Sequence, residues 1–217
     1  MKFNISPRAK NILEWVYCIV IAIVLALLFR YFIGTPTVVR QPSMYNTLEE
    51  GQRLILNRWV RTVNGKYERG DIITFEAPSS PVPSLFEIDT NNPVAKYEYK
   101  PKGIFAKFNY YVLEFSKTSY IKRVIGLPGE HVEIKGGKVY IDGQILEENY
   151  LDDSVKTYIP VGGIDDFIVP EGYVFAMGDN RNGSSDCRLF GCVPIEKIEG
   201  RVSVRIWPLN KIGKIDK

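Results

Sequence analysis

The stretch HVEIKGGKVYIDGQIL, residues 131–146, decides the fold class of this 217-residue chain. It contains three short runs, HVEIK, KVYI and QIL, which are rich in β-branched residues and roughly alternate between apolar and polar side chains. The pairs Gly136-Gly137 and Asp142-Gly143 separate these runs, and such pairs favour the tight turns that join neighbouring strands. The stretch therefore predicts consecutive β-strands rather than helices.

Turn residues recur throughout the chain beyond its N-terminal apolar segment, and we expect further strands at 120–126, 173–177 and 201–207. Asn64-Gly65 lies between RLILNRWVRTV and DIITF, which is typical of a hairpin or a longer β-connection. This part of the chain contains no convincing long amphipathic helix. Many short strands with glycine-rich turns predict a mostly β domain, built as a β-barrel or a sandwich.

Residues 76–119 break this pattern and are predicted to form an irregular insertion. The segment opens with the proline-rich APSSPVPS, and Pro93 and Pro101 continue it. IFAKFNYYVLEF, residues 104–115, is dense in aromatic side chains. We interpret this run as a hairpin or helix packed on the edge of the domain, and the alternative is a patch that enters a membrane surface.

The N-terminal apolar segment is predicted to be a transmembrane helix. Residues 15–29, WVYCIVIAIVLALLF, are apolar without interruption, and counted to Ile33 the segment has 19 residues, or roughly 28 Å of helix. Trp15 and Tyr31 lie at its two ends, where interfacial aromatic residues belong. Arg30 lies close enough to the end for its side chain to reach the lipid headgroups.

The basic residues Lys2, Arg8 and Lys10 precede this segment, so the positive-inside rule predicts the orientation of the chain. We expect a cytoplasmic N-terminus at 1–14, a single-pass anchor in the cell membrane at 15–33, and an extracytoplasmic domain at 36–217. A cleaved secretory signal is the alternative, but the sequence RYFIGTPTVVRQ after the run is a poor match to a small-residue cleavage site.

Composition excludes several classes of function. A formal net charge of +3, with Lys and Arg scattered among Asp and Glu, argues against a nucleic-acid partner. With three cysteines and one histidine, the chain has too few ligands for a zinc site, and we predict no metal and no cofactor. Cys187 and Cys192 are near in sequence, so pairing in an oxidising compartment remains open beside two free thiols.

Two polar residues in separate segments carry the catalytic hypothesis. Ser43 lies in QPSMYNTL, about ten residues beyond the apolar segment, and Lys122 lies in YIKRVIGLPGE among apolar neighbours that indicate a partly buried strand. In an alternating strand Tyr120, Lys122 and Val124 share one face. A lysine in apolar surroundings has its charged form disfavoured, which lowers its pKa. Neutral lysine can take a proton from a serine hydroxyl, so a dyad needs no histidine.

A third polar segment, MGDNRNGSSDCRLFGCVP at 177–194, completes a pattern that resembles the bacterial type I signal peptidases, or leader peptidases, which are Ser-Lys dyad serine proteases. Four motifs occur in the order of that family behind an N-terminal anchor. They are SMYNTL at 43–48, RGDIITF at 69–75, YIKRVIGLPGE at 120–130 and GDNRNGSSDCR at 178–188.

The resemblance implies a membrane-bound serine endopeptidase with a signal-peptidase-like β domain. Its substrates are expected to be exported preproteins, whose N-terminal signal peptides it cleaves after small residues at sites of the A-x-A type. The expected partners are therefore these signal peptides and membrane lipid, and contact with the secretion machinery is left open. The substrate is expected to lie extended against exposed strands, with pockets that accept small side chains.

The resemblance also implies a role for each matching residue. Ser43 is expected to be the nucleophile, with its backbone N–H in the oxyanion hole, and Lys122 the general base. Ser184 is expected to hydrogen-bond the lysine amine and orient it, while Met44 packs near the dyad. Two structural ion pairs are implied near the site, namely Asp186 with Arg188 and Asp179 with Arg123.

Three positions depart from the family pattern. Asn46 occupies a position that is usually proline, which predicts a looser turn after the nucleophile. Gln41 replaces a small polar residue two positions before the nucleophile, so its amide becomes the candidate for a second oxyanion donor. Cys187 replaces the second serine of S-x-D-S-R, a position expected to be supporting rather than catalytic.

Other interpretations have less support. A membrane-tethered scaffold that keeps the fold but has lost turnover draws only on Gln41 and Asn46. A self-processing Ser-Lys protease of the repressor type is disfavoured by the anchor. Residues 119–122 match the S-x-x-K motif of penicillin-binding enzymes, but that motif works on a helix, whereas on a strand Ser119 and Lys122 point to opposite faces.

Overall fold

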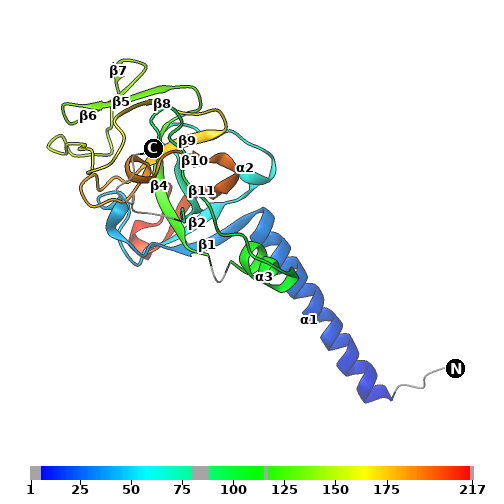
Figure 1. Ribbon diagram of the computed structural model, residues 1–217. Helices are drawn as coiled ribbons and strands as arrows, with labels where there is room; N and C mark the ends of the chain where they lie inside the picture. Colours follow the sequence, from blue (N-terminus) through cyan, green and yellow to red (C-terminus); the bar gives the residue numbers. More distant parts are fainter. Residues whose placement is uncertain (1–5, 80–87, 115–116, 216–217) are drawn as a thin grey trace.

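The computed structural model describes residues 6–79, 88–114 and 117–215, and Figure 1 shows a long N-terminal helix leading away from a β-rich body. This helix, α1, spans Pro7–Phe32 and is capped by Ser6, whose hydroxyl accepts a hydrogen bond from the Ala9 N–H at 3.3 Å. None of its residues is buried, and within the described ranges it is the one helix long and apolar enough to cross a membrane. The predicted apolar segment therefore lies in a helix that begins at Pro7 rather than at Trp15.

Two antiparallel sheets form the body. The larger sheet has seven strands in the order β1-β2-β11-β3-β4-β9-β10, and the smaller has four in the order β7-β6-β5-β8. The strands of the larger sheet are β1 (Gly34–Val38), β2 (Arg53–Asn57), β3 (Ile72–Glu76), β4 (Ser119–Gly126), β9 (Tyr173–Met177), β10 (Val193–Pro194) and β11 (Ile198–Trp207). Those of the smaller sheet are β5 (His131–Lys135), β6 (Lys138–Ile141), β7 (Gln144–Ile145) and β8 (Asp166–Ile168).

The structure confirms a mostly β fold. The stretch 131–146 forms β5, β6 and β7, with Val132 opposite Ile141 and Tyr140 opposite Ile145, as its two turn pairs predict. The strands expected at 120–126, 173–177 and 201–207 are β4, β9 and β11, the last of these beginning at Ile198. The described strands form two separate sheets and do not close into a barrel.

Of the two alternatives expected at Asn64-Gly65, the hairpin is wrong and the chain makes a longer connection between β2 and β3. The chain instead forms a short helix, α2 (Trp59–Thr62), and Gly65 closes it by donating its N–H to the Val60 carbonyl at 2.7 Å. Asn64 takes a positive φ of 49°, which is typical of a helix C-terminus. The strands on either side do not pair, because β11, from the far end of the chain, lies between β2 and β3. The local turn signal cannot reveal that non-local partner.

The predicted insertion contains helix, which is one of the two forms, hairpin or helix, expected for 104–115. Within it, α3 (Ile104–Phe108) continues directly into a π-helical turn, η2 (Asn109–Leu113). Part of the proline-rich segment, 80–87, lies outside the described residues, as does Lys2. The remaining short helices are η1 (Pro42–Met44), α4 (Cys187–Phe190), η3 (Ile195–Lys197) and η4 (Leu209–Lys211).

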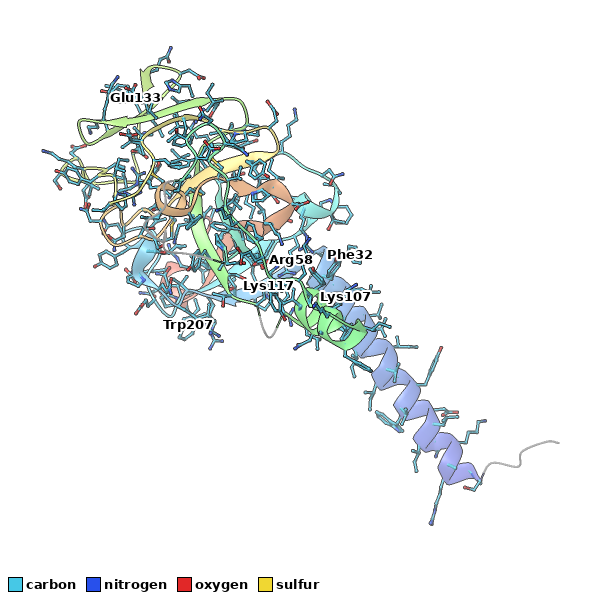
Figure 2. All side chains as sticks on the ribbon, in the orientation of Figure 1. Phe32, Arg58, Lys107, Lys117, Glu133 and Trp207 are labelled. Atoms are coloured by element: carbon cyan, nitrogen blue, oxygen red, sulfur yellow. The ribbon has the colours of Figure 1, made fainter. Side chains whose placement is uncertain are left out.

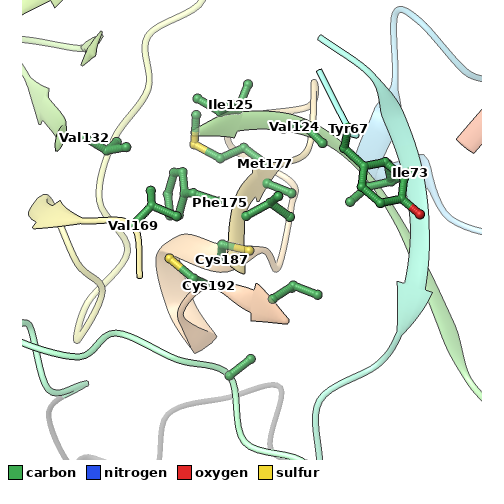
Figure 3. Close-up of a cluster of buried hydrophobic side chains, with 14 of the residues drawn as sticks. Tyr67, Ile73, Val124, Ile125, Val132, Val169, Phe175, Met177, Cys187 and Cys192 are labelled. Atoms are coloured by element: carbon green, nitrogen blue, oxygen red, sulfur yellow. The ribbon is translucent and has the colours of Figure 1, made fainter. Parts of the chain in front are cut away.

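Two hydrophobic cores hold the body together. The larger lies among residues of both sheets, and Figure 3 shows Phe175, Met177 and Val132 within it together with Cys187 and Cys192. Both cysteines are free and buried, so the pairing left open by their spacing is not formed. The smaller core comprises Val39, Met44, Leu48, Leu54 and Ile72. This second core positions the candidate nucleophile, because Met44 follows Ser43 directly.

Candidate active site

Ser43 lies in the middle of the single-turn helix η1, on a tightly closed loop. Pro42 begins the turn, and its carbonyl accepts a hydrogen bond from the Tyr45 N–H at 2.9 Å. The next residue, Met44, has no exposed surface and inserts its side chain into the smaller core. Burial of a methionine side chain stabilises by about 1.5–3 kcal/mol, so this contact holds the serine against the sheet.

Lys122 lies on β4, an interior strand of the larger sheet. Its backbone is opposite Ile73 of β3, and the following residue, Arg123, is opposite Met177 of β9. Because its side chain is almost fully buried, loss of hydration lowers the pKa of the Lys122 ammonium from its usual 10.5 to about 8, against the opposing attraction of the Asp186 carboxylate. A substantial fraction of this amine is therefore neutral in mildly alkaline solution.

The two predicted dyad residues meet in the structure. Lys122 Nζ donates a hydrogen bond to Ser43 Oγ at 2.7 Å, and both side chains are buried. The distance lies within the range for direct proton transfer between a nucleophile and its base. The arrangement can therefore convert a serine hydroxyl into a nucleophile with no histidine, since neutral Nζ can accept the Oγ proton.

The segment 178–188 holds the nucleophile loop from the other side, mainly through Asn180. The Asn180 N–H donates to the Ser43 carbonyl at 3.1 Å, and its side-chain amide donates to the Pro42 carbonyl at 3.2 Å. The sequence pattern assigns no role to Asn180. The available signal was its place inside the fourth motif, but no residue pattern indicates which backbone carbonyl an asparagine will reach.

A buried ion pair joins β4 to the same segment. Arg123 donates from Nε and Nη2 to the Asp179 carboxylate at 3.0 and 2.8 Å, and the Thr47 hydroxyl donates to Asp179 at 2.6 Å. The ring of Tyr150 covers the guanidinium with 3.8 Å from Cζ to its centroid. Arg123 and Asp179 thus lie together as expected, and Thr47 is an additional member that links them to the nucleophile loop.

The other expected pair, Asp186 with Arg188, lies close to the dyad. Arg188 donates from Nε and Nη2 to the Asp186 carboxylate at 2.8 and 2.9 Å, and that carboxylate also accepts the Gly178 N–H at 3.0 Å. All three groups are in the buried interior, where the many hydrogen bonds compensate for lost hydration. The pair fixes the start of α4 and the backbone at Gly178, which packs directly against Ser43.

Ser184, Gln41 and Asn46 differ from the expectations. Ser184 Oγ is buried beside Gly178, but it has no hydrogen-bond partner in the part of the chain that the structure describes, so the expected bond to Lys122 is not formed. Gln41 is exposed and lines a groove together with residues 36–40. Asn46 has a positive φ of 80° and donates to the Asp152 carboxylate at 3.2 Å, so this turn is held rather than loosened.

An open groove of about 630 Å³ lies next to the dyad in sequence, since its lining includes Gln41, two residues before Ser43, and Ile121, directly before Lys122. One wall is β1 with the residues up to Gln41, and the other is formed by the start of β4, including Tyr120. The Tyr120 ring also lies 5.4 Å from Lys122 Nζ, which places the amine next to this wall. Strand β1 pairs only with β2 in the described sheet, so its outer edge faces the groove with main-chain groups free for a further strand.

The described residues contain no group of three or more His, Cys, Asp or Glu side chains that could hold a metal ion. Burial raises the pKa of both the Cys187 and the Cys192 thiol, which disfavours the reactive thiolate form. Ser43 and Lys122 therefore remain the candidate reactive pair among these residues.

Comparisons with known proteins identify the family of this chain. The model of the family "Signal peptidase, peptidase S26" matches residues 12–207. Signal peptidase I S of Bacillus subtilis strain 168 is 34% identical over 99% of both chains, and signal peptidase I of Bacillus licheniformis is 35% identical over 97% of both. A crystal structure of a signal peptidase I from Enterococcus faecalis V583 is 27% identical, covers 64% of this chain and 97% of its own, and has a TM-score of 0.39. The chain belongs to the signal peptidase family, peptidase S26.

Proposed function

We propose that this protein is a membrane-tethered endopeptidase that removes signal peptides from exported preproteins with a Ser43–Lys122 dyad. The observation that carries the proposal is the 2.7 Å contact between Lys122 Nζ and Ser43 Oγ, both buried. Membership of the family supports signal peptides as the substrate class. Cleavage after small residues at A-x-A sites rests on the resemblance of the four motifs to that family.

The proposed reaction begins with neutral Lys122 accepting the proton of Ser43 as Oγ attacks the scissile carbonyl. The resulting lysine ammonium then donates a proton to the leaving amine, which departs as the new N-terminus of the mature protein. Water, activated by the same amine, hydrolyses the acyl-enzyme and releases the signal peptide. Each half-reaction thus uses one base that regains its starting state.

Stabilisation of the oxyanion is assigned to the backbone N–H of Ser43, which moves with the nucleophile. Gln41 is the candidate for a second donor, since it is exposed, lines the groove and directly precedes the serine turn η1. The substrate would lie extended in that groove and add a strand to the free edge of β1. Main-chain hydrogen bonds would hold many different signal peptides, while side-chain pockets select small residues near the cut.

Tethering is assigned to the apolar part of α1, residues 15–33, with 1–14 on the cytoplasmic side and the catalytic domain, 36–217, outside. Its length and composition support a membrane span, and the basic residues Arg8 and Lys10 support the orientation. The partners are then the signal peptide and the surrounding lipid. The anchor would then hold the serine at the membrane that exported preproteins have to cross.

Cleavage of a preprotein by the purified full-length protein in detergent tests the proposal. Cleavage is expected after an A-x-A sequence, and Ser43→Ala and Lys122→Ala should each lower the rate on the order of a thousand-fold or more. Lys122→Arg should be equally inactive, because a guanidinium keeps its proton. Ser154→Ala and Lys138→Ala, at exposed positions of the same residue types, should leave the rate unchanged.

An active Lys122→Arg variant would rule out lysine as the base. A parent protein that folds but cleaves none of several preproteins would instead favour a scaffold that has lost turnover. Thermal unfolding of each variant separates a chemical effect from loss of structure. The close contact within the dyad favours turnover, because a scaffold has no need of a buried amine with a lowered pKa.

A further inference from the structure

The helical part of the insertion has several large apolar side chains that are almost fully exposed to solvent or exposed by about half. Ile104 and Phe105 at the start of α3 are 84% and 90% exposed, and Phe108 and Tyr111 are also exposed. The opposite side is firmly attached, because buried Tyr110 donates its hydroxyl to Glu76 of β3 at 2.7 Å. A segment held rigidly with its apolar side chains outward is typical of a binding surface rather than of loose packing.

This segment is attached to the outer end of the proposed membrane anchor. Arg30, two residues before the end of α1, donates to the Leu113 carbonyl at 2.8 Å and lies 3.5 Å from the Glu114 carboxylate. Glu114 in turn accepts two hydrogen bonds from buried Arg58, at 2.9 and 2.6 Å. Figure 1 shows α3 next to the outer half of α1. Wherever α1 crosses a bilayer, α3 therefore lies at the level of its outer surface.

The charge around α3 suits a membrane surface with anionic lipids. Between Glu98 and Glu114 the sequence has three lysines, Lys100, Lys102 and Lys107, and no acidic residue. All three are exposed. They line a hollow of about 600 Å³. Lys197 also lines this hollow, and Glu196 is the acidic residue among its lining residues. Figure 2 shows Lys107 in the region where α1 meets the body. Apolar tips flanked by lysines are the composition of interfacial helices.

We propose that residues 99–111 form a second membrane contact, in which Ile104 and Phe105 enter the outer leaflet and the three lysines bind the phosphates of anionic lipids. The proposal rests on the proposed membrane tethering by α1. It extends that function, because Lys117, Ser119 and Tyr120 of the groove wall follow this contact within a few residues. Two attachments to the bilayer would hold the groove in one orientation, whereas a single helix would leave rotation about its axis free.

Site-specific fluorescence on the full-length protein tests this contact. Cys187 and Cys192 are buried, so a thiol-reactive, environment-sensitive dye can be directed to Cys18 in the anchor of the parent protein. In a Cys18→Ser background, Phe105→Cys places the dye on α3. Ile145→Cys, at an exposed position on β7 that Figure 1 shows far from α1, is the matched control. Each protein is reconstituted into phosphatidylcholine vesicles with and without phosphatidylglycerol.

The dye at position 105 should be quenched by lipid-borne quenchers and shielded several-fold from aqueous iodide, relative to the dye at 145. Phosphatidylglycerol should strengthen the shielding, and Lys100→Gln/Lys102→Gln/Lys107→Gln should remove that increase. If Cys18 is in lipid but position 105 is as accessible as 145, the second contact is refuted while the anchor stands. If Cys18 itself is in water, the tethering fails and this proposal with it.

Activity provides an independent measurement. Ile104→Ser/Phe105→Ser should lower the cleavage rate in vesicles several-fold but leave the rate in detergent unchanged, because the groove itself is intact. Ile145→Ser should change neither rate. Equal loss in detergent and vesicles would instead indicate a structural role and overturn the proposal. Shielding of position 105 only after a preprotein is added would also overturn it, since the surface would then bind protein.

Discussion

Arg123 and Asp179 form a buried ion pair, with Nη2 2.8 Å from the carboxylate and both side chains fully enclosed. Removing one partner leaves an uncompensated charge in the interior, so Asp179→Ala should lower the free energy of unfolding by about 3–5 kcal/mol. Arg123→Met/Asp179→Leu should cost less than Asp179→Ala, because no lone charge remains. Urea unfolding of the three proteins measures the difference.

The single variant should also lose activity, since Asp179 holds Thr47 of the nucleophile loop. Glu133→Ala, at the partly exposed Lys135–Glu133 pair on β5, is the control and should change the unfolding free energy by less than about 1 kcal/mol. A double variant as unstable as Asp179→Ala would show that the pair contributes more than mutual neutralisation.

The pH dependence of cleavage should follow the lowered pKa of Lys122. The ammonium form cannot accept a proton, so kcat/KM should be low in acid, rise with a midpoint near pH 8 and then level off. The Asp186 carboxylate raises the pKa of Lys122, so Asp186→Asn should move the midpoint to lower pH in whatever activity remains. Rates measured from about pH 6 to pH 10 give both midpoints. A midpoint that moves upward would contradict the arrangement of charges.

Gly178 should tolerate no side chain. A Cβ atom there would overlap Ser184 Oγ and the Ser43 carbonyl oxygen, far inside ordinary contact distance. Gly178→Ala should therefore destabilise the protein by about 1–3 kcal/mol and, by displacing the serine, lower activity roughly a hundred-fold. Gly213→Ala is the matched control, because no atom lies within 4 Å of its added Cβ. Thermal unfolding and cleavage rates of both variants test this, and a fully active Gly178→Ala protein would be incompatible with the packing described.

Replacing Asn46 with proline, the residue usual at this position in the family, should destabilise the protein. Its φ is 80°, whereas a proline ring holds φ near −65°, so Asn46→Pro requires the turn after Ser43 to rebuild. We expect a loss of more than about 1 kcal/mol of stability together with reduced activity. Asn46→Gly accepts the positive φ and should retain both, apart from the lost bond to Asp152. Comparable stability of the proline and glycine variants would argue against this backbone geometry.

Local patterns predicted the local parts of the fold. Alternation and paired turn residues gave β5 to β7 correctly, because these strands pair with their sequence neighbours. The same signals left a hairpin and a longer connection open at Asn64-Gly65, where the structure has the longer connection with α2, and a C-terminal strand lies between β2 and β3. Pairing across about 130 residues depends on the assembled core, which no short window of sequence contains.

The candidate site likewise has parts that the sequence predicts and parts that it does not. The motifs placed Ser43, Lys122 and the two ion pairs together, and the distances agree with that expectation. They could not reveal that Asn180 holds the serine turn, or that Ser184 lacks a bond to the lysine. Such contacts depend on side-chain rotamers and on shifts of about 1 Å, which residue type and spacing leave undetermined.

The joint between α1 and the body contains a partly buried carboxylate, Glu114, shared by Arg58 and Arg30, and Figure 2 shows Arg58 beside the end of the helix at Phe32. The hydroxyl of Thr62 also donates to the Phe32 carbonyl at 3.0 Å. These contacts fix the orientation of the body relative to α1. In a bilayer, Ser43 would therefore lie at one fixed height above the membrane surface. The enzyme would then select substrates by distance. It would cleave preproteins whose scissile bond lies at that height above the membrane, and leave uncut those whose scissile bond lies closer to the membrane or farther from it.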